Sequence, residues 1–309
     1  MKYLSILMKN VAQVLLLENA WTGLLVIVAL LIGDWKVGLV ALIASVIALL
    51  LAKHTNYSRT EIDSGLAGFN PVLTGVALTL FLEQTWYSYI IIIVAIVITM
   101  PVGAAIRELF KTYDVPMLTI PYVFVSWSVL LMSFQFKFVN VNVNILPQSV
   151  KKISFSQNAI HFMSSFLSGF SEVFLLKSTL AGLLILIGIF VASRKAGFLA
   201  IMANLIGFIM VLLLGANHSE INDGLFGYNV ILTVLALGVA FKTRINRYIN
   251  IILGILLTIF LHAGLTTLLT PFGLPVFTLP FIIATWTILL AGTRMKKQTI
   301  EEHDGKSAT

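Results

Sequence analysis

A ten-residue segment in the first half of the chain recurs in the second half without a gap. Gly65–Thr74 reads GLAGFNPVLT, and Gly224–Thr233 reads GLFGYNVILT, at a constant offset along the chain. At the same offset, Pro116–Pro121 (PMLTIP) matches Pro275–Pro280 (PVFTLP). Chance similarity between apolar helices would match Leu and Val, whereas these matches keep Gly, Asn, Pro and Thr in register. The sequence therefore predicts two copies of one unit.

The composition places both copies in a membrane. Apolar residues make up 59% of the 309 residues and charged residues 11%, whereas soluble domains carry about 25% charged residues. Several apolar runs are long enough for a helix to cross a hydrocarbon core of about 30 Å. The sequence lacks the short alternating segments that are typical of a transmembrane barrel. We therefore expect an all-α integral membrane protein.

Each copy contains five apolar runs. We expect the first membrane repeat at residues 1–134, an extramembrane linker at 135–159, the second, inverted repeat at 160–293 and a polar cytoplasmic tail at 294–309. The runs lie near residues 14–33, 37–52, 66–82, 87–106, 117–134, 173–191, 196–214, 225–241, 248–269 and 276–292.

An odd number of spans in each copy requires the two copies to cross the membrane in opposite orientations. If the N-terminus is cytoplasmic, the Lys and Arg residues that remain outside are Lys36, Lys137, Lys151, Lys152 and Lys177, out of 20 in total. This distribution satisfies the positive-inside rule. We expect a ten-span, multi-pass protein of the cell membrane with both termini in the cytoplasm.

The recurring motifs interrupt helices at membrane depth. Glycines before Asn70 and Asn229 favour broken or re-entrant helices, which lipid tolerates only where the backbone is buried or lines a cavity; the alternative is an ordinary helix start capped by Asn. Thr119 and Thr278 each lie between two prolines, which free backbone carbonyls; the alternative is a Thr bonded to its own helix. Because both motifs occur twice, we expect a pore where the two copies meet.

Further candidate residues occupy matching positions. Gln13 and Glu172 share a side-chain oxygen that accepts hydrogen bonds, and a carboxylate at membrane depth usually faces protein or water. The alternative is that Glu172 is an interfacial residue at a helix N-terminus. In each copy an aromatic residue precedes a leucine by one helical turn. Such a pair either lines a slot or packs in the core. These pairs are Phe69 with Leu73 and Tyr228 with Leu232.

The sequence lacks the residues that several classes of function require. The sequence has no Cys for disulfides or thiol catalysis. Of its five His residues only His262 lies within a predicted span, so we expect neither a metal cluster nor paired histidines in an ammonia pore. Motifs for phosphate binding or hydrolysis are absent from the sequence. We expect no enzyme activity, no cofactor and no nucleic-acid partner.

These repeated motifs resemble the urea transporter family over essentially the whole chain. One family hallmark, Gly-Leu-x-Gly-Phe/Tyr-Asn, stands here as Gly65–Asn70 and Gly224–Asn229. The other, Leu-Pro-x-Phe-Thr-x-Pro-Phe, corresponds to Val115–Tyr122 and Leu274–Phe281. The family also opens its repeat with Gln-Val-x-Phe, which reads Gln13-Val-Leu-Leu16 in this chain.

The resemblance implies a homotrimer in the lipid membrane, with a separate central pore in each subunit. Urea would pass through a narrow slot of aromatic and aliphatic side chains while a ladder of oxygens receives its NH groups. Leu16 and Leu175 stand where the family usually has aromatic residues, so half of each slot would be aliphatic. The residues implied to contact urea are Gln13, Leu16, Phe69, Leu73, Thr119, Glu172, Leu175, Tyr228, Leu232 and Thr278.

A slot of this kind suits urea, which is small, flat and neutral and carries several NH donors. An apolar slot with a row of acceptors replaces the water that urea loses, whereas an ion would not recover its hydration energy. We therefore expect passive, channel-like urea transport. The alternative is a secondary active transporter, or a channel for another small polar solute such as a short amide or ammonia.

Overall fold

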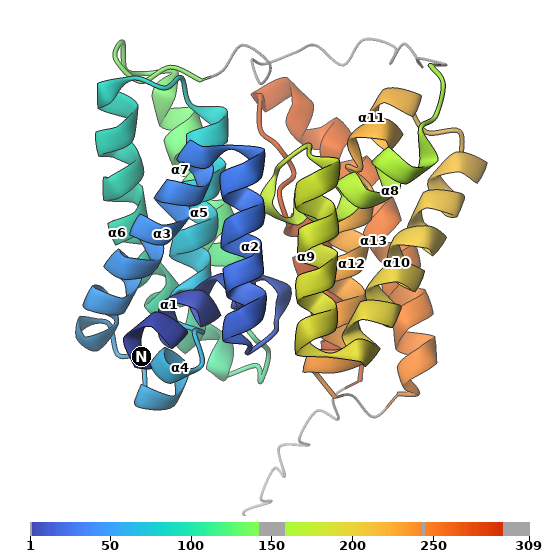
Figure 1. Ribbon diagram of the computed structural model, residues 1–309, viewed down its shortest axis with the longest axis horizontal. Coiled ribbons are helices and arrows are strands. Elements are labelled where there is room, and N and C mark those ends of the chain that lie inside the picture. Colours follow the sequence, from blue (N-terminus) through green and yellow to red (C-terminus); the bar gives the residue numbers. More distant parts are fainter. Residues whose placement is uncertain (1, 142–157, 243–244, 293–309) are drawn as a thin grey trace, which may run out of the picture.

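The computed structural model describes residues 2–141, 158–242 and 245–292, and these residues form helices joined by short connections (Figure 1). The first half contains α1 (Lys2–Ala12), η1 (Gln13–Leu15), α2 (Ala20–Gly33), α3 (Trp35–Leu51), η2 (Ala52–His54), α4 (Arg59–Asp63), α5 (Phe69–Phe81), α6 (Trp86–Lys111) and α7 (Ile120–Ser133). The second half contains α8 (Phe162–Ser171), η4 (Glu172–Phe174), α9 (Thr179–Ala192), α10 (Arg194–Leu213), α11 (His218–Asp223), α12 (Gly227–Leu235), η5 (Ala236–Ala240), α13 (Arg247–Leu269), η6 (Thr270–Phe272) and α14 (Leu279–Ala291). The all-helical expectation is confirmed for the described residues.

Within the described residues, four helices are long and apolar enough to cross a membrane, and up to six if each bent pair counts as one span. The four are Trp35–His54, Trp86–Lys111, Arg194–Leu213 and Arg247–Phe272. The bent pairs are Lys2–Leu15 with Ala20–Gly33, at 78°, and Phe162–Phe174 with Thr179–Ala192, at 73°. The chain is a multi-pass membrane protein.

The expected ten full-length spans are not all present. Four of the apolar runs form shorter helices, namely Phe69–Phe81, Ile120–Ser133, Gly227–Ala240 and Leu279–Ala291. A helix of 13 residues, such as α5, is about 20 Å long and does not cross a hydrocarbon core of about 30 Å. Each short helix follows a recurring Gly or Pro motif, which keeps the preceding apolar residues out of the helix.

The structure also bears on the start of the first predicted run and on the predicted linker. The first run starts as a helix at Ala20 rather than near residue 14, because Leu16 adopts a left-handed backbone conformation with φ 58°. Of the predicted linker, residues 135–141 and 158–159 are described, and Val141 pairs with Leu82 in an antiparallel bridge. The remainder of the linker and the predicted tail at 294–309 lie outside the described residues.

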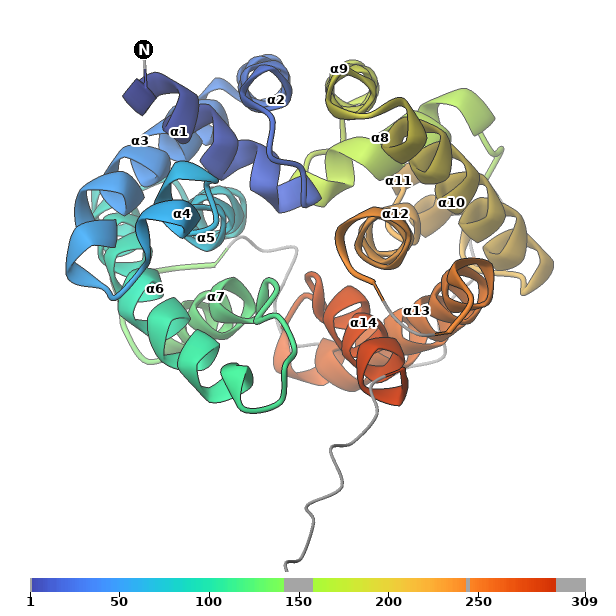
Figure 2. The same ribbon diagram turned by 90° about the horizontal axis from the view of Figure 1, so that it is seen from below.

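The two halves lie side by side and meet along two seams, α2 against α9 and α7 against α14 (Figure 2). On the first seam, the Thr22 hydroxyl donates to the Gly188 carbonyl at 2.7 Å. Glycines also bring the two helices within each bent pair close together: a β-carbon at Gly23 in α2 would overlap the Met8 carbonyl in α1, and one at Gly182 in α9 would overlap the Leu167 carbonyl in α8.

Two tryptophans exchange hydrogen bonds between the halves. Trp127 in α7 donates its indole N–H to the Pro275 carbonyl, and Trp286 in α14 donates to the Pro116 carbonyl, both at 2.8 Å. Each proline lies just before the short helix of its own half, so its carbonyl has no place in a helical ladder. The indoles satisfy these carbonyls across the interface.

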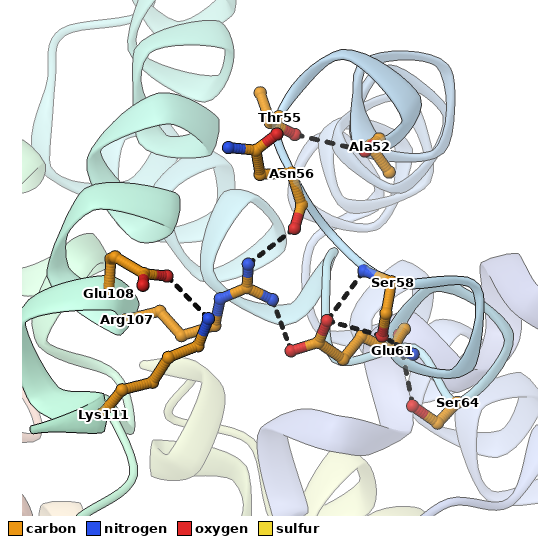
Figure 3. Close-up of polar contacts among 9 residues, drawn as sticks. All are labelled: Ala52, Thr55, Asn56, Ser58, Glu61, Ser64, Arg107, Glu108 and Lys111. Atoms are coloured by element: carbon orange, nitrogen blue, oxygen red, sulfur yellow. Dashed lines mark hydrogen bonds and ion pairs between the residues drawn. The ribbon is translucent and has the colours of Figure 1, made fainter.

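A polar clamp, made by Arg107, Glu61, Asn56, Ser58 and Tyr57, holds the segment before α5 in the first half (Figure 3). Arg107 at the end of α6 pairs with Glu61 in α4 and donates to the Asn56 carbonyl at 2.7 Å. Glu61 also accepts from the amide and hydroxyl of Ser58, which caps α4. The guanidinium lies 4.5 Å from the ring centre of Tyr57. The clamp fixes α4 to the end of α6.

We predict that Trp127→Phe and Trp286→Phe each lower the melting temperature of the purified protein by several degrees. Each substitution leaves a part-buried carbonyl without its donor, at a cost of about 1–3 kcal/mol. Trp21→Phe is the matched control, because Trp21 is 69% exposed. Equal melting temperatures for all three variants would contradict the proposed contribution of the exchanged bonds.

The clamp also predicts a pH-dependent stability. Partial burial raises the pKa of Glu61, but hydrogen bonds from Ser58 and Arg107 outweigh that effect and hold the pKa below its ordinary value of 4.5. A carboxyl with a lowered pKa stabilises the folded state above its unfolded pKa and loses this contribution as the pH falls through the folded pKa. Wild type should therefore melt above Glu61→Gln at pH 7, and the gap should close as the pH falls below 4.5.

Glu108→Gln serves as the control for this titration, because Glu108 pairs with Lys111 at the exposed surface. Its melting temperature should follow that of wild type across the pH range. A gap between wild type and Glu61→Gln that stays constant down to acidic pH would show that the Glu61 charge does not stabilise the fold.

Candidate functional site

Thr119 and Thr278, which occupy equivalent positions in the two halves, contact each other. Thr119 and Thr278 precede α7 and α14, both are buried, and their hydroxyl oxygens lie 2.7 Å apart. The residues before them, Leu118 and Phe277, both have φ 48°, which is uncommon for residues with a side chain. This strained backbone turns each hydroxyl toward the other half. The two motifs thus meet in a contact between the copies.

The motif asparagines hold this strained backbone. Asn70 donates its amide to the Leu118 carbonyl at 3.1 Å and accepts from the Tyr122 amide at 3.3 Å. Asn229 makes the same pair of bonds with the Phe277 carbonyl and the Phe281 amide, at 3.1 and 3.3 Å. Neither asparagine acts as an ordinary helix cap, because neither side chain accepts from a backbone amide of its own helix. Asn70 in α5 bonds to the start of α7, and Asn229 in α12 bonds to the start of α14.

The predicted aromatic–leucine pairs lie beside this centre. Phe69, Leu73, Tyr228 and Leu232 are all at least 96% buried in α5 and α12. Tyr228 differs from Phe69 in carrying a hydroxyl, which donates to the Phe277 carbonyl at 2.6 Å. The Phe277 carbonyl therefore receives two donors, one from Tyr228 and one from Asn229.

Gln13 and Glu172 occupy equivalent positions in η1 and η4 but differ in their bonds. Gln13 is buried and donates its side-chain amide to the Ser64 carbonyl at 2.9 Å. Glu172 is 3% exposed and has no such donor when ionised. Its Oε1 atom has no hydrogen-bond partner among the described residues. A buried acceptor without a partner is costly, so it is available to a bound donor.

Leu16 and Leu175 end the short helical turns η1 and η4, with φ 58° and 61°. Both are half-buried and pack against the core. Their left-handed backbone produces the bend between the paired helices, which is a role that the apolar pattern of the sequence did not reveal.

A cavity of about 640 Å³ is lined mainly by the second half, including Glu172, Leu175 and Tyr228, and on one side by Leu80 and Phe81 at the end of α5. Phe81 and Phe277 also line it and contact each other edge to face, with ring centres 5.5 Å apart. These two phenylalanines were missed by the sequence analysis, although Phe277 is part of the motif that ends in Thr278. The other predicted site residues do not line this cavity, namely Gln13, Leu16, Phe69, Leu73, Thr119, Leu232 and Thr278.

The two ends of the molecule differ in charge arrangement. The clamp holds Glu61 in the first half, whereas the equivalent Glu220 in α11 lines the cavity, and Thr266 stands at the position of Arg107. Burial, and secondarily the nearby Asp223, raises the pKa of Glu220. Within the described residues no three His, Cys, Asp or Glu side chains are grouped to hold a metal ion. The polar groups of this site suit a neutral hydrogen-bonding solute.

Comparison with known proteins agrees with this arrangement. A family model described as "Urea transporter" matches residues 4–293. The chain is similar to "Urea transporter 1" of Ovis aries, with 25% identity over 300 residues, 95% of this chain and 78% of that protein. It is similar to the protein of the same name from Rattus norvegicus, with 25% identity over 299 residues and the same shares. The chain therefore belongs to the urea transporter family, whose members are membrane transporters rather than enzymes.

Proposed function

We propose that this protein conducts urea passively across the cell membrane, along a path from the cavity in the second half, past the Thr119–Thr278 pair, to the first half. The contact between the two threonine hydroxyls carries the proposal, because it places two hydroxyls from different halves at one buried point. Urea itself is suggested by the relatives, which are named for urea transport.

The chemistry of the path fits this solute. A hydroxyl both donates and accepts, so each threonine is able to exchange its bond to the other threonine for a bond to urea. The free Oε1 of Glu172 accepts from an NH group at the cavity. Apolar walls disfavour ions, which lose more hydration energy than a neutral amide. The walls of the proposed slot are Leu16, Phe69, Leu73, Leu175, Tyr228 and Leu232.

The arrangement of helices supports two inverted repeats, which we propose for residues 1–134 and 160–293. The bent helix α1 lies near the lower end of the molecule and its counterpart α8 near the upper end (Figure 1). Bonds recur at matching positions, such as Thr74 with Thr99 and Thr233 with Thr258. With the basic loops on the inner side, both termini are cytoplasmic. We further propose a homotrimer with one pore in each subunit, on the family resemblance.

We predict that replacing both threonines by valine lowers urea permeability about five- to tenfold, because Thr119→Val with Thr278→Val keeps the shape but removes both central hydroxyls. Stopped-flow light scattering on proteoliposomes under an inward urea gradient measures this change. Thr287→Val is the matched control, because its hydroxyl is exposed and bonds only within α14. Urea flux in the double variant equal to that of wild type would place the path elsewhere.

A channel and a secondary active transporter give different results when ion gradients change. We predict that wild-type urea flux stays the same when a Na⁺ or H⁺ gradient is imposed, reversed or removed in the same vesicles. Accumulation of urea above its external concentration, driven by either gradient, would identify the protein as an active transporter. Passage of ammonia or acetamide but not of urea would support a channel and contradict urea as its solute.

A further inference from the structure

The cavity of the second half is lined by a histidine that has no counterpart in the first half. His262 lies in α13, and the equivalent position in α6 is Gly103. In the first half, a β-carbon on Gly103 would lie 2.9 Å from the Tyr57 hydroxyl, so the tyrosine of the clamp occupies this space. The second half has Ala216 at the position of Tyr57, so the space near His262 is left to the cavity.

The hydrogen bonds around Asn229 fix the proton on this histidine. The side-chain oxygen of Asn229 accepts from the Phe281 amide at 3.3 Å, so its nitrogen points the other way. That nitrogen lies 3.1 Å from the Phe277 carbonyl and 3.3 Å from Nδ1 of His262. An amide nitrogen only donates, so Nδ1 of the neutral ring accepts, and the ring proton is on Nε2.

The Nε2–H group is available to a solute. The ring of His262 is held between Phe226 and Tyr228, with ring centres 4.8 and 6.0 Å away. His262 is 4% exposed, and that exposure is to the cavity, which it lines. In the described part of the chain, Nε2 has no hydrogen-bond partner. A fixed donor thus faces a cavity that also contains the free acceptor of Glu172.

We propose that His262 is a specificity-determining residue that donates a hydrogen bond from Nε2 to the carbonyl oxygen of the solute, while Glu172 accepts from its NH groups. The proposal rests on the function proposed above and deepens it. Urea has one acceptor, its carbonyl oxygen, and in the cavity, which the central threonines do not line, the acceptor of Glu172 would leave that oxygen without a partner. A donor at the cavity selects planar amides with a strong carbonyl acceptor over solutes that lack one.

Two substitutions distinguish hydrogen-bond donation from Nε2 of His262 from a structural role of His262 as the acceptor for Asn229. His262→Gln places an amide nitrogen near the position of Nε2 and keeps a donor in the cavity. His262→Asn places its oxygen near the position of Nδ1, so it keeps the contact with Asn229, but its shorter side chain leaves no donor at the position of Nε2. Each variant is compared with wild type in urea flux at increasing urea concentration, and in the ratio of urea to thiourea permeability, since sulfur is the weaker acceptor. Melting temperatures verify that both variants fold.

We expect His262→Asn to raise the half-saturating urea concentration about three- to tenfold, the equivalent of one hydrogen bond, and to reduce the preference for urea over thiourea. His262→Gln should stay close to wild type in both measurements. Normal transport in His262→Asn would overturn the inference, as would impairment confined to His262→Gln, which is the result expected for a purely structural histidine. Absence of urea flux in wild type would instead overturn the proposed function and this inference together.

Discussion

Peptide groups in the interior of a membrane have no water to bond, so every interruption of a helix needs an internal partner. Asn70 and Asn229 provide that partner for the strained segments that precede α7 and α14. Each asparagine bonds to a carbonyl before the helix and to an amide within its first turn, which fixes where the helix begins. These amide bonds fix the position of the central threonines. They also fix the tautomer of His262.

The repeat made part of the site predictable. The match of Thr119 with Thr278 predicted only that both threonines face the centre of the molecule, and the structure adds that their hydroxyls contact each other. The start of the short helix α7 was not predictable from hydropathy, because the apolar run already includes Met117 and Leu118 although the helix begins only at Ile120. The bends at Leu16 and Leu175 depend on backbone conformation, which apolar periodicity does not report. His262 was visible in the sequence, but its bond to Asn229 joins residues far apart in the chain.

Differences between the copies explain why the cavity is lined mainly by the second of the two described halves. Both copies contain the same series of helices. They differ in the side chains that fill the space beside Gly103 in the first half and beside His262 in the second. In the first half Tyr57 occupies this space beneath Arg107. Arg107 in turn pairs with Glu61 (Figure 3). In the second half Ala216 and Thr266 stand at these positions, and Glu220 faces the cavity. The proposed pathway therefore has similar helices at both ends but different polar groups, with His262 and Glu172 at the end formed by the cavity.

The exchanged tryptophan bonds also constrain how the chain is made. The Pro116 carbonyl receives its donor from Trp286, which follows 170 residues later in the sequence. During synthesis the ribosome completes the first half long before that donor exists, so this carbonyl is unsatisfied or bonded to a temporary partner until the second half arrives. The first half consequently reaches its final structure only after most of the second half has entered the membrane. Truncation after the first half would leave the Pro116 carbonyl without the donor that Trp286 provides.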